Sequence, residues 1–137
     1  MSTGMLHLHH YLPFVFFLLL VINIFRSFLG RIANPKKDKL LLFTMVLAHV
    51  QLLIGLFLLF PFPEVEISVI IKDSARRFKY IEHPSIMLLA VILITLAKSK
   101  SKKIEDVAKV NKTIYTYFII VLVLIVLGTP WAELFKL

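Results

Sequence analysis

Cysteine is absent from the 137-residue chain, and glycine and acidic residues are scarce: there are 4 glycines and 8 Asp and Glu residues. Without cysteine the chain forms no disulfide, thiolate metal site, iron–sulfur cluster or covalent c-type haem attachment. It also lacks a glycine-rich phosphate loop, an HExxH pair and a Ser-His-Asp spacing, and its long apolar runs contain no acidic residue. The last absence argues against a carboxylate proton relay and an intramembrane aspartyl protease. Histidine is therefore the side chain left for chemistry.

Apolar residues are abundant instead: 59% of the chain is hydrophobic, 18% is charged, and the mean hydropathy is +0.89. Soluble domains are about 45–50% apolar and about 25% charged, and a chain this small leaves much of its surface exposed when it folds. A water-soluble globular domain is therefore excluded, and we expect one membrane domain over residues 1–137. The net charge of +8 does not indicate a nucleic-acid partner, because the 16 Lys and Arg residues lie in clusters between the apolar runs.

Four apolar runs are long enough, or nearly so, to cross the hydrocarbon core of a bilayer, which takes about 20 residues of helix. Each run is expected to be helical, because lipid offers no partner for backbone N–H and C=O groups. The sequence thus predicts an all-α membrane protein, a bundle of four transmembrane helices over approximately residues 8–29, 40–60, 80–97 and 113–132. The third run has only 14 residues, Pro84–Ala97, before Lys98. It must recruit residues from Phe78 to His83 or thin the bilayer locally.

Local signals refine the ends of these helices. The first run has no basic residue before it and no small-residue cleavage site after it, so we expect a retained helix rather than a signal peptide. Pro84 suits the first turn of the third helix, and Asn111 or Thr113 is expected to cap the fourth. The apolar stretch Ile67–Ile71 is compatible with a short strand or an interfacial helix.

Orientation in the membrane follows from the positions of Lys and Arg. Eleven of the 16 basic residues lie after the first and third helices, between residues 26 and 39 and between residues 98 and 112. The other five lie on the opposite side, where acidic residues offset them. We therefore expect a multi-pass protein of a bacterial inner membrane with both termini outside the cytoplasm (N-out and C-out). Its expected partners are the lipid bilayer and either further copies of itself or a larger membrane complex.

Five histidines stand out among the leucine, isoleucine, valine and phenylalanine residues: His7, His9, His10, His49 and His83. An ionisable residue within a membrane helix is costly and faces the bundle interior, so each is a candidate functional residue. His49 lies about 15 Å from the inner border at Lys39, near the bilayer midplane. Four neighbouring residues share one stripe of the helix, and the small ones among them allow close approach of another helix or a flat ligand: Ala48, Gln51, Leu52 and Gly55. His49 either binds a ligand or forms a packing hydrogen bond with a neighbouring helix.

The other four histidines lie near the expected outer surface. His83 stands at the outer mouth of the third helix, where it either serves as a ligand or is exposed to water near the helix start. His7, His9 and His10 stand at the outer entrance of the first helix, and at most one or two of them can point inward. For any one of these three, exposure to solvent is the simpler alternative.

Histidines on separate helices suit non-covalent haem b, which membrane bundles hold through axial imidazoles from facing helices. At 1.5 Å per residue, His10 lies about 24 Å and His83 about 22 Å from the inner basic border, against about 15 Å for His49. Two ligands of one iron should lie at similar depth, so His83 pairs better with a histidine of the first helix, although helix tilt loosens this test. Three basic residues lie just above, where they either pair with haem propionates or belong to a solvated loop: Arg76, Arg77 and Lys79.

Three segments carry a resemblance to a known family: Leu6-His7-Leu8-His9, Phe43-x4-Ala48-His49-x-Gln51-Leu52-Leu53-x-Gly55 and Glu82-His83-Pro84-x-x-Met87. They resemble small four-helix membrane proteins of Bacteroidota that are described as cytochrome b-like, and the resemblance covers nearly the whole chain. The layout is also distantly similar to one half of a haem A synthase, although the chain lacks the cysteine pair of some of these enzymes. The resemblance implies haem binding, with His49, His83 and one histidine of the first helix as candidate ligands.

Two functions of different classes remain. The first is a haem b-binding membrane protein that transfers electrons or serves as a haem-bearing subunit. Its candidate metal ligands are His49 and His83, and its candidate cofactor-binding residues are His49, His83, His7, His9, His10, Arg76 and Arg77. The alternative is a cofactor-free accessory or structural subunit of an inner-membrane complex, which the small size favours. No hydrolase or transferase motif is present, and a transporter is disfavoured because the runs show no inverted repeat.

Overall fold

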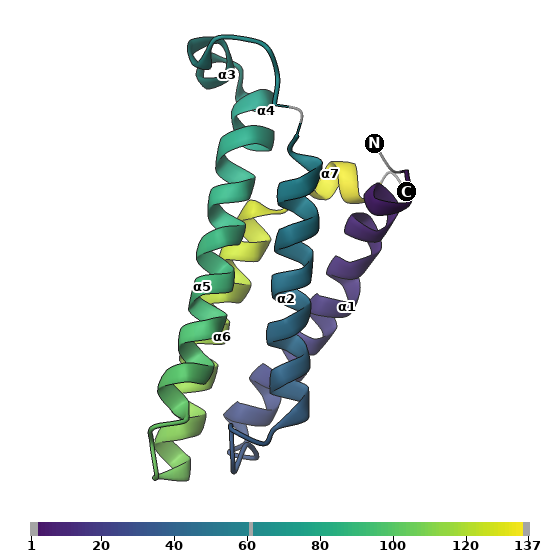
Figure 1. Cartoon of the computed structure of the whole chain (residues 1–137). Helices are drawn as coiled ribbons and strands as arrows, with labels where there is room; N and C mark the ends of the chain where they lie inside the picture. Colours follow the sequence, from purple (N-terminus) through teal and green to yellow (C-terminus); the bar gives the residue numbers. More distant parts are fainter. Residues whose placement is uncertain (1–2, 61, 136–137) are drawn as a thin grey trace.

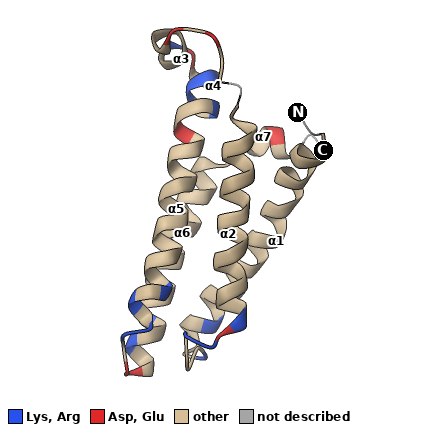
Figure 2. Cartoon of the chain, in the orientation of Figure 1, with Lys and Arg blue, Asp and Glu red and all other residues tan. Residues whose placement is uncertain are grey.

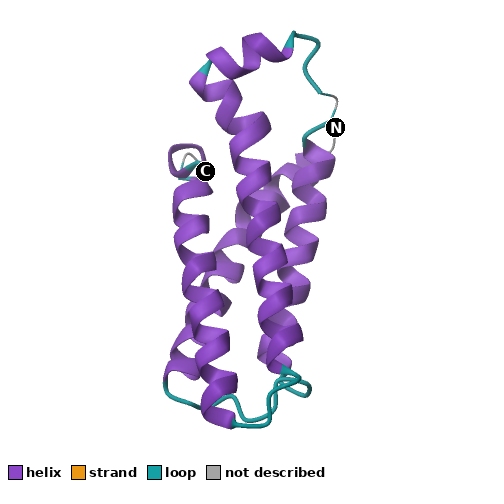
Figure 3. Ribbon diagram, turned by 90° about the vertical axis from the view of Figure 1, so that its left-hand side faces the viewer, coloured by secondary structure: helices purple, strands orange, loops and turns teal. Residues whose placement is uncertain are grey.

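The computed structural model describes residues 3–60 and 62–135 as an all-α bundle, and no strand occurs among them (Figure 3). Its four long helices run alternately up and down: α1 (Thr3–Phe28), α2 (Lys39–Leu58), α5 (His83–Ser101) and α6 (Val107–Gly128) (Figure 1). Between α2 and α5 lie the short helices α3 (Ile67–Lys72) and α4 (Ser74–Arg77) and the π-helical turn η1 (Phe78–Glu82), and α7 (Trp131–Leu134) follows α6. The predicted four-helix bundle is confirmed.

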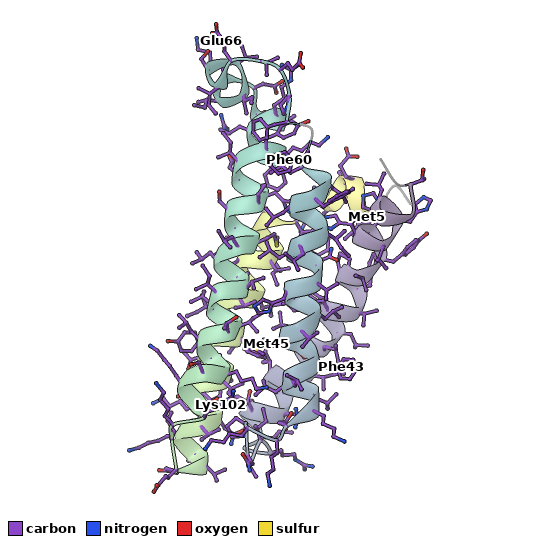
Figure 4. The ribbon with its side chains drawn as sticks, viewed as in Figure 1. Met5, Phe43, Met45, Phe60, Glu66 and Lys102 are labelled. Atoms are coloured by element: carbon purple, nitrogen blue, oxygen red, sulfur yellow. The ribbon has the colours of Figure 1, made fainter. Side chains whose placement is uncertain are left out.

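The four long helices form a closed ring in which each contacts two neighbours. Helix α1 packs against α2 and α6, and α5 packs against the same two helices. The core between them is built of fully buried apolar side chains, among them Leu20, Ile94 and Phe118. On α2, Met45 packs against this core whereas Phe43 points away from it and is 67% exposed (Figure 4). Such large exposed apolar side chains on the outside of the ring are what a lipid-facing surface requires.

Four segments of the described chain are long and apolar enough to cross a membrane: Thr3–Phe28, Lys39–Leu58, Ser74–Ser101 and Val107–Gly128. The chain is therefore a multi-pass membrane protein. The third segment reaches 28 residues because α4, η1 and α5 continue one another, so the entrance residues are recruited into the helix as expected. The wide turn η1 precedes Pro84, which has no N–H to donate. There the N–H of His83 bonds to the carbonyl of Phe78, five residues back.

Helix α6 starts earlier in the chain than the sequence predicts. Helix α6 begins at Val107 and is capped by Asp106, whose side chain accepts from the N–H of Ala108 at 3.0 Å, so the predicted caps at Asn111 and Thr113 are wrong. The hydropathy pattern marks the edge of the lipid core, and α6 continues past that edge. Asn111 is instead buried and clasps the backbone of Ile32, donating to its carbonyl at 2.9 Å and accepting from its N–H at 3.0 Å. The stretch Ile67–Ile71 is helical within α3.

Basic residues gather at one end of the bundle, where α1 joins α2 and α5 joins α6 (Figure 2). Lys102 lies at this end, Glu66 lies at the opposite tip (Figure 4), and both chain ends lie on the side away from Lys102 (Figure 1). At the basic end Asp38 caps α2 by accepting from the N–H of Leu41 at 2.9 Å and forms a two-point ion pair with Arg26. Burial alone would raise the pKa of Asp38, but the hydrogen bonds from Arg26 and Leu41 lower it below its ordinary value.

Candidate functional site

A large cavity occupies the end of the bundle opposite the basic loops. Its volume is about 1270 Å³, and aliphatic and aromatic side chains form most of its wall. Towards its N-terminal end α1 tilts outward from the rest of the bundle (Figure 1), and residues of α1, α2, α5, α6 and α7 line the cavity. Helix α7 and the residue after it pack aromatic rings against α1 on this side, Trp131 on Phe17 and Phe135 on Phe14. The polar side chains in the wall include His9, His10, Gln51 and His83.

Pro13, inside α1, explains how one of these histidines is held. Proline has no N–H, so the carbonyl of His9, four residues earlier, loses its partner within the helix. The side-chain amide of Gln51 on α2 replaces that partner by donating to the His9 carbonyl at 2.8 Å. The same amide nitrogen lies 3.1 Å from Nδ1 of the His9 ring. Gln51 therefore holds both the backbone and the ring of His9.

Gly55, one turn further along α2, provides room for this ring. A Cβ atom at Gly55 would lie 2.9 Å from Cε1 of His9, closer than such contacts allow. The small-residue stripe predicted on α2 is thus the surface that receives the His9 ring. Its Ala48 and Leu52 also line the cavity.

His83 approaches the cavity from the opposite side, at the first residue of α5. Its Nδ1 donates to the carbonyl oxygen of Gly128, at the end of α6, at 2.5 Å. Gly128 allows this approach, since a Cβ atom there would lie 2.6 Å from Cγ2 of Ile86 on α5. The bond fixes the ring and leaves its Nε2 as the nitrogen that carries a lone pair.

The rings of His9 and His83 form a pair across the cavity. Their centres lie 6.4 Å apart and their planes are almost perpendicular, at 87°. Each ring has Nδ1 engaged, by Gln51 and by Gly128 respectively, and Nε2 has no hydrogen-bond partner among the residues that the structure describes. Within the described ranges no three His, Cys, Asp or Glu side chains gather as they would around a metal ion.

The other three histidines lie outside this pair. His10 lines the cavity, and its Nδ1 is buried without a hydrogen-bond partner in the described part of the chain. His7 is exposed, does not line the cavity and contacts the ring of Tyr11. His49 does not line the cavity either: Nδ1 donates to the carbonyl of Met45 at 2.8 Å, and Nε2 lies 3.4 Å from the Thr95 hydroxyl.

The three basic residues expected above the histidines also have different surroundings. Arg77 donates to Glu82 at 2.8 Å and to the carbonyl of Ile71 at 2.8 Å, and Arg76 lies 3.5 Å from the Asp73 carboxylate. Neither arginine lines the large cavity. Lys79 does line it, one turn outward of His83, as does Glu133 of α7. Lys79 is therefore the cation best placed for an anionic group inside the cavity.

Sequence reasoning did not identify three residues on which this site depends. Gln51 was recognised only as part of a stripe, and neither Pro13 nor Gly128 was connected with a histidine. The sequence does carry a signal for Pro13 and Gln51. A proline inside a membrane helix frees the carbonyl four residues earlier, and that carbonyl needs a donor from another helix. No such signal exists for Gly128, whose carbonyl meets His83 only through the packing of α6 on α5.

Comparison of the chain with protein-family models, with curated proteins and with solved structures gives no match. The geometry of the cavity and of its histidine pair is therefore the basis on which a function is proposed.

Proposed function

We propose that this protein binds haem b in the cavity, with His83 and His9 as its axial ligands. The observation that carries the proposal is the separation of the two ring centres, 6.4 Å. Two imidazoles that ligate one metal ion from opposite sides have ring centres about 6 Å apart, because each metal–nitrogen bond is about 2 Å long. The pair on α1 and α5 already has the separation that such a site needs.

The small number of ligands also favours a prosthetic group over a free metal ion. Two histidines alone leave a metal incompletely coordinated, whereas a tetrapyrrole supplies the remaining nitrogens itself. The apolar wall suits a flat macrocycle, and Lys79 at the outer part of the wall suits its carboxylates. Bound haem b supplies reversible one-electron chemistry, so electron transfer, alone or as a haem-bearing subunit, is the proposed activity.

The choice of His9 as the second ligand refines the prediction made from the sequence, in which His49 was a candidate. His49 is bonded within its own helix and faces Thr95 rather than the cavity. The geometry supports His9 as the partner of His83 and a packing role for His49. Resemblance to cytochrome b-like proteins is consistent with this proposal.

We further propose that the protein lies in a bacterial inner membrane with its basic end in the cytoplasm. The basic end carries the two loops that join α1 to α2 and α5 to α6 (Figure 2). Both chain ends and the histidine pair then lie towards the outer side.

Single histidine variants test the ligand assignment by haem content per protein after purification from haem-replete cells. We expect His83→Ala to lose most of its haem and His9→Ala to change the spectrum to that of a five-coordinate iron. His7→Ala is the matched control, because His7 lies on the same helix but outside the cavity wall. Normal haem content in a His9→Ala, His83→Ala double variant would overturn the assignment, and colourless wild-type protein would favour the accessory-subunit alternative.

A further inference from the structure

We infer that the two ligands are unequal: His83 is the permanent ligand, and His9 exchanges with small exogenous ligands such as carbon monoxide or cyanide. The inference rests on the proposed haem site and names a class of ligand for it. It follows from the hydrogen bonds that determine where each imidazole carries its proton.

His83 is held in the form that ligates a metal. Its Nδ1 faces the carbonyl oxygen of Gly128 at 2.5 Å, and a carbonyl oxygen only accepts hydrogen bonds. The proton of the neutral ring is therefore on Nδ1 and the lone pair is on Nε2. Hydrogen bonds of this kind orient a ligating histidine and strengthen it as a ligand.

His9 is held in the opposite form. The Gln51 atom that lies 2.8 Å from the His9 carbonyl must be the amide nitrogen, since an oxygen there would face another oxygen. The same amide nitrogen lies 3.1 Å from Nδ1 of His9, and it has only hydrogens to offer, so Nδ1 is the acceptor. The proton of the neutral ring is then on Nε2, the nitrogen that would have to ligate the iron.

Ligation by His9 consequently has a cost that ligation by His83 does not have. To hold haem through Nε2, the neutral His9 ring would need its proton on Nδ1 instead, and the amide of Gln51 would lose its acceptor there. With an exogenous ligand in its place, His9 would keep the proton on Nε2 and the hydrogen bond from Gln51 to Nδ1. The ring keeps one proton and no net charge throughout, and the displaced His9 presents an N–H to the incoming ligand.

Carbon monoxide binding to the reduced, haem-loaded full-length protein in detergent tests the inference by difference spectroscopy. We expect wild-type protein to bind carbon monoxide, and Gln51→Glu to lower its affinity about tenfold. The carboxylate gives up the bond to the His9 carbonyl and turns an oxygen to Nδ1, where it accepts from Nδ1–H and favours the ligating form. Gln51→Leu, which removes the donor without adding an acceptor, should also lower the affinity, by less. Leu53→Ala, on the exposed face of the same helix, is the matched control.

The direction of the change separates this role from a merely structural one. If Gln51 only positioned the ring, both Gln51 variants would loosen His9 and the affinity for carbon monoxide would rise. That result, or a haem-loaded wild-type protein that binds no carbon monoxide, would overturn the inference and leave the haem proposal standing. A wild-type protein without haem would overturn the proposed function itself.

Discussion

At the scale of single residues, the geometry of the site depends on where side chains are missing as much as on where they are present. Gly55 leaves the space that the His9 ring occupies, and Gly128 leaves the space in which α5 and α6 approach closely enough for His83 to reach a backbone carbonyl. Both glycines therefore act on the histidine pair through the space that they leave.

Gly55→Ala tests this role. Its Cβ would meet Cε1 of His9 at 2.9 Å, so the ring must shift away from α2 and from its position opposite His83. We expect haem affinity to fall about tenfold, the usual effect of disturbing the groups that orient a ligand, with about 1–3 kcal/mol of stability lost to overpacking. Haem titration followed through the Soret band measures the first effect, and unchanged affinity would contradict the placement of His9.

A second residue-scale prediction concerns Asp38 and pH. Because the pKa of Asp38 is lowered in the folded protein, its contribution to stability is complete above the unfolded pKa of about 3.9 and is lost as pH falls through the folded value. Asp38→Asn keeps an oxygen to cap α2 but removes the charge that pairs with Arg26. The variant should be less stable than wild type at pH 7 and equally stable well below pH 4. Thermal unfolding in detergent at both pH values would detect this convergence, and a constant difference would argue against the ion pair.

At the scale of elements, the outer half of α1 separates from the bundle, and this separation makes room for the cavity. Pro13 interrupts the hydrogen bonds of α1 in this half of the helix. The carbonyl that it frees, that of His9, accepts from Gln51 of α2. The bond from α2 replaces the missing one within α1, so the two helices remain tied at the level of His9.

Pro13→Ala is expected to straighten α1. Residue 13 then donates to the His9 carbonyl in place of Gln51, and the straightened helix carries the His9 ring away from its position opposite His83. We expect higher thermal stability, since a helix bond is restored, together with weaker haem binding. The two measurements should move in opposite directions, and a variant that loses stability would show that the proline is needed for folding rather than for the site.

The elements also show how far the sequence alone could lead. Four spanning helices follow from apolar runs, and the recruitment of Phe78–His83 follows from the shortness of the third run. The start of α6 could not be placed, because Val107–Lys112 is polar enough to resemble a loop and is helical through the Asp106 cap and the clasp of Asn111 on Ile32. The depths of the histidines in the membrane predict that His83 pairs with a histidine of the first helix. Depth does not determine in which direction around the helix axis a side chain faces. Which ring faces the cavity depends on helix packing, on Gln51 and on Gly128.

At the scale of the whole molecule, the basic loops and the candidate site lie at opposite ends of the bundle. The basic loops lie at one end of the bundle and both chain ends lie towards the other (Figures 1 and 2). The cavity with its histidines is lined by residues of that second end. If the basic end is cytoplasmic, the proposed haem lies near the outer surface, where an electron partner on that side would reach it.

Reporter fusions test this orientation. Alkaline phosphatase joined to the C-terminus should be active, because it folds only outside the cytoplasm, and a green fluorescent protein in the same place should be dark. The same reporters placed in the loop between α5 and α6 should give the opposite pattern. Fluorescence at the C-terminus would reverse the topology and place the histidine pair near the cytoplasm.

The most direct test of the haem proposal is the absorption spectrum of the full-length protein purified in detergent from haem-replete cells. We predict a Soret band that shifts on reduction with dithionite and has the low-spin character of an iron with two imidazole ligands, and we predict that His83→Ala removes it while His7→Ala leaves it unchanged. A colourless wild-type protein, or a Soret band that survives unaltered in His83→Ala, would contradict a haem held between α1 and α5.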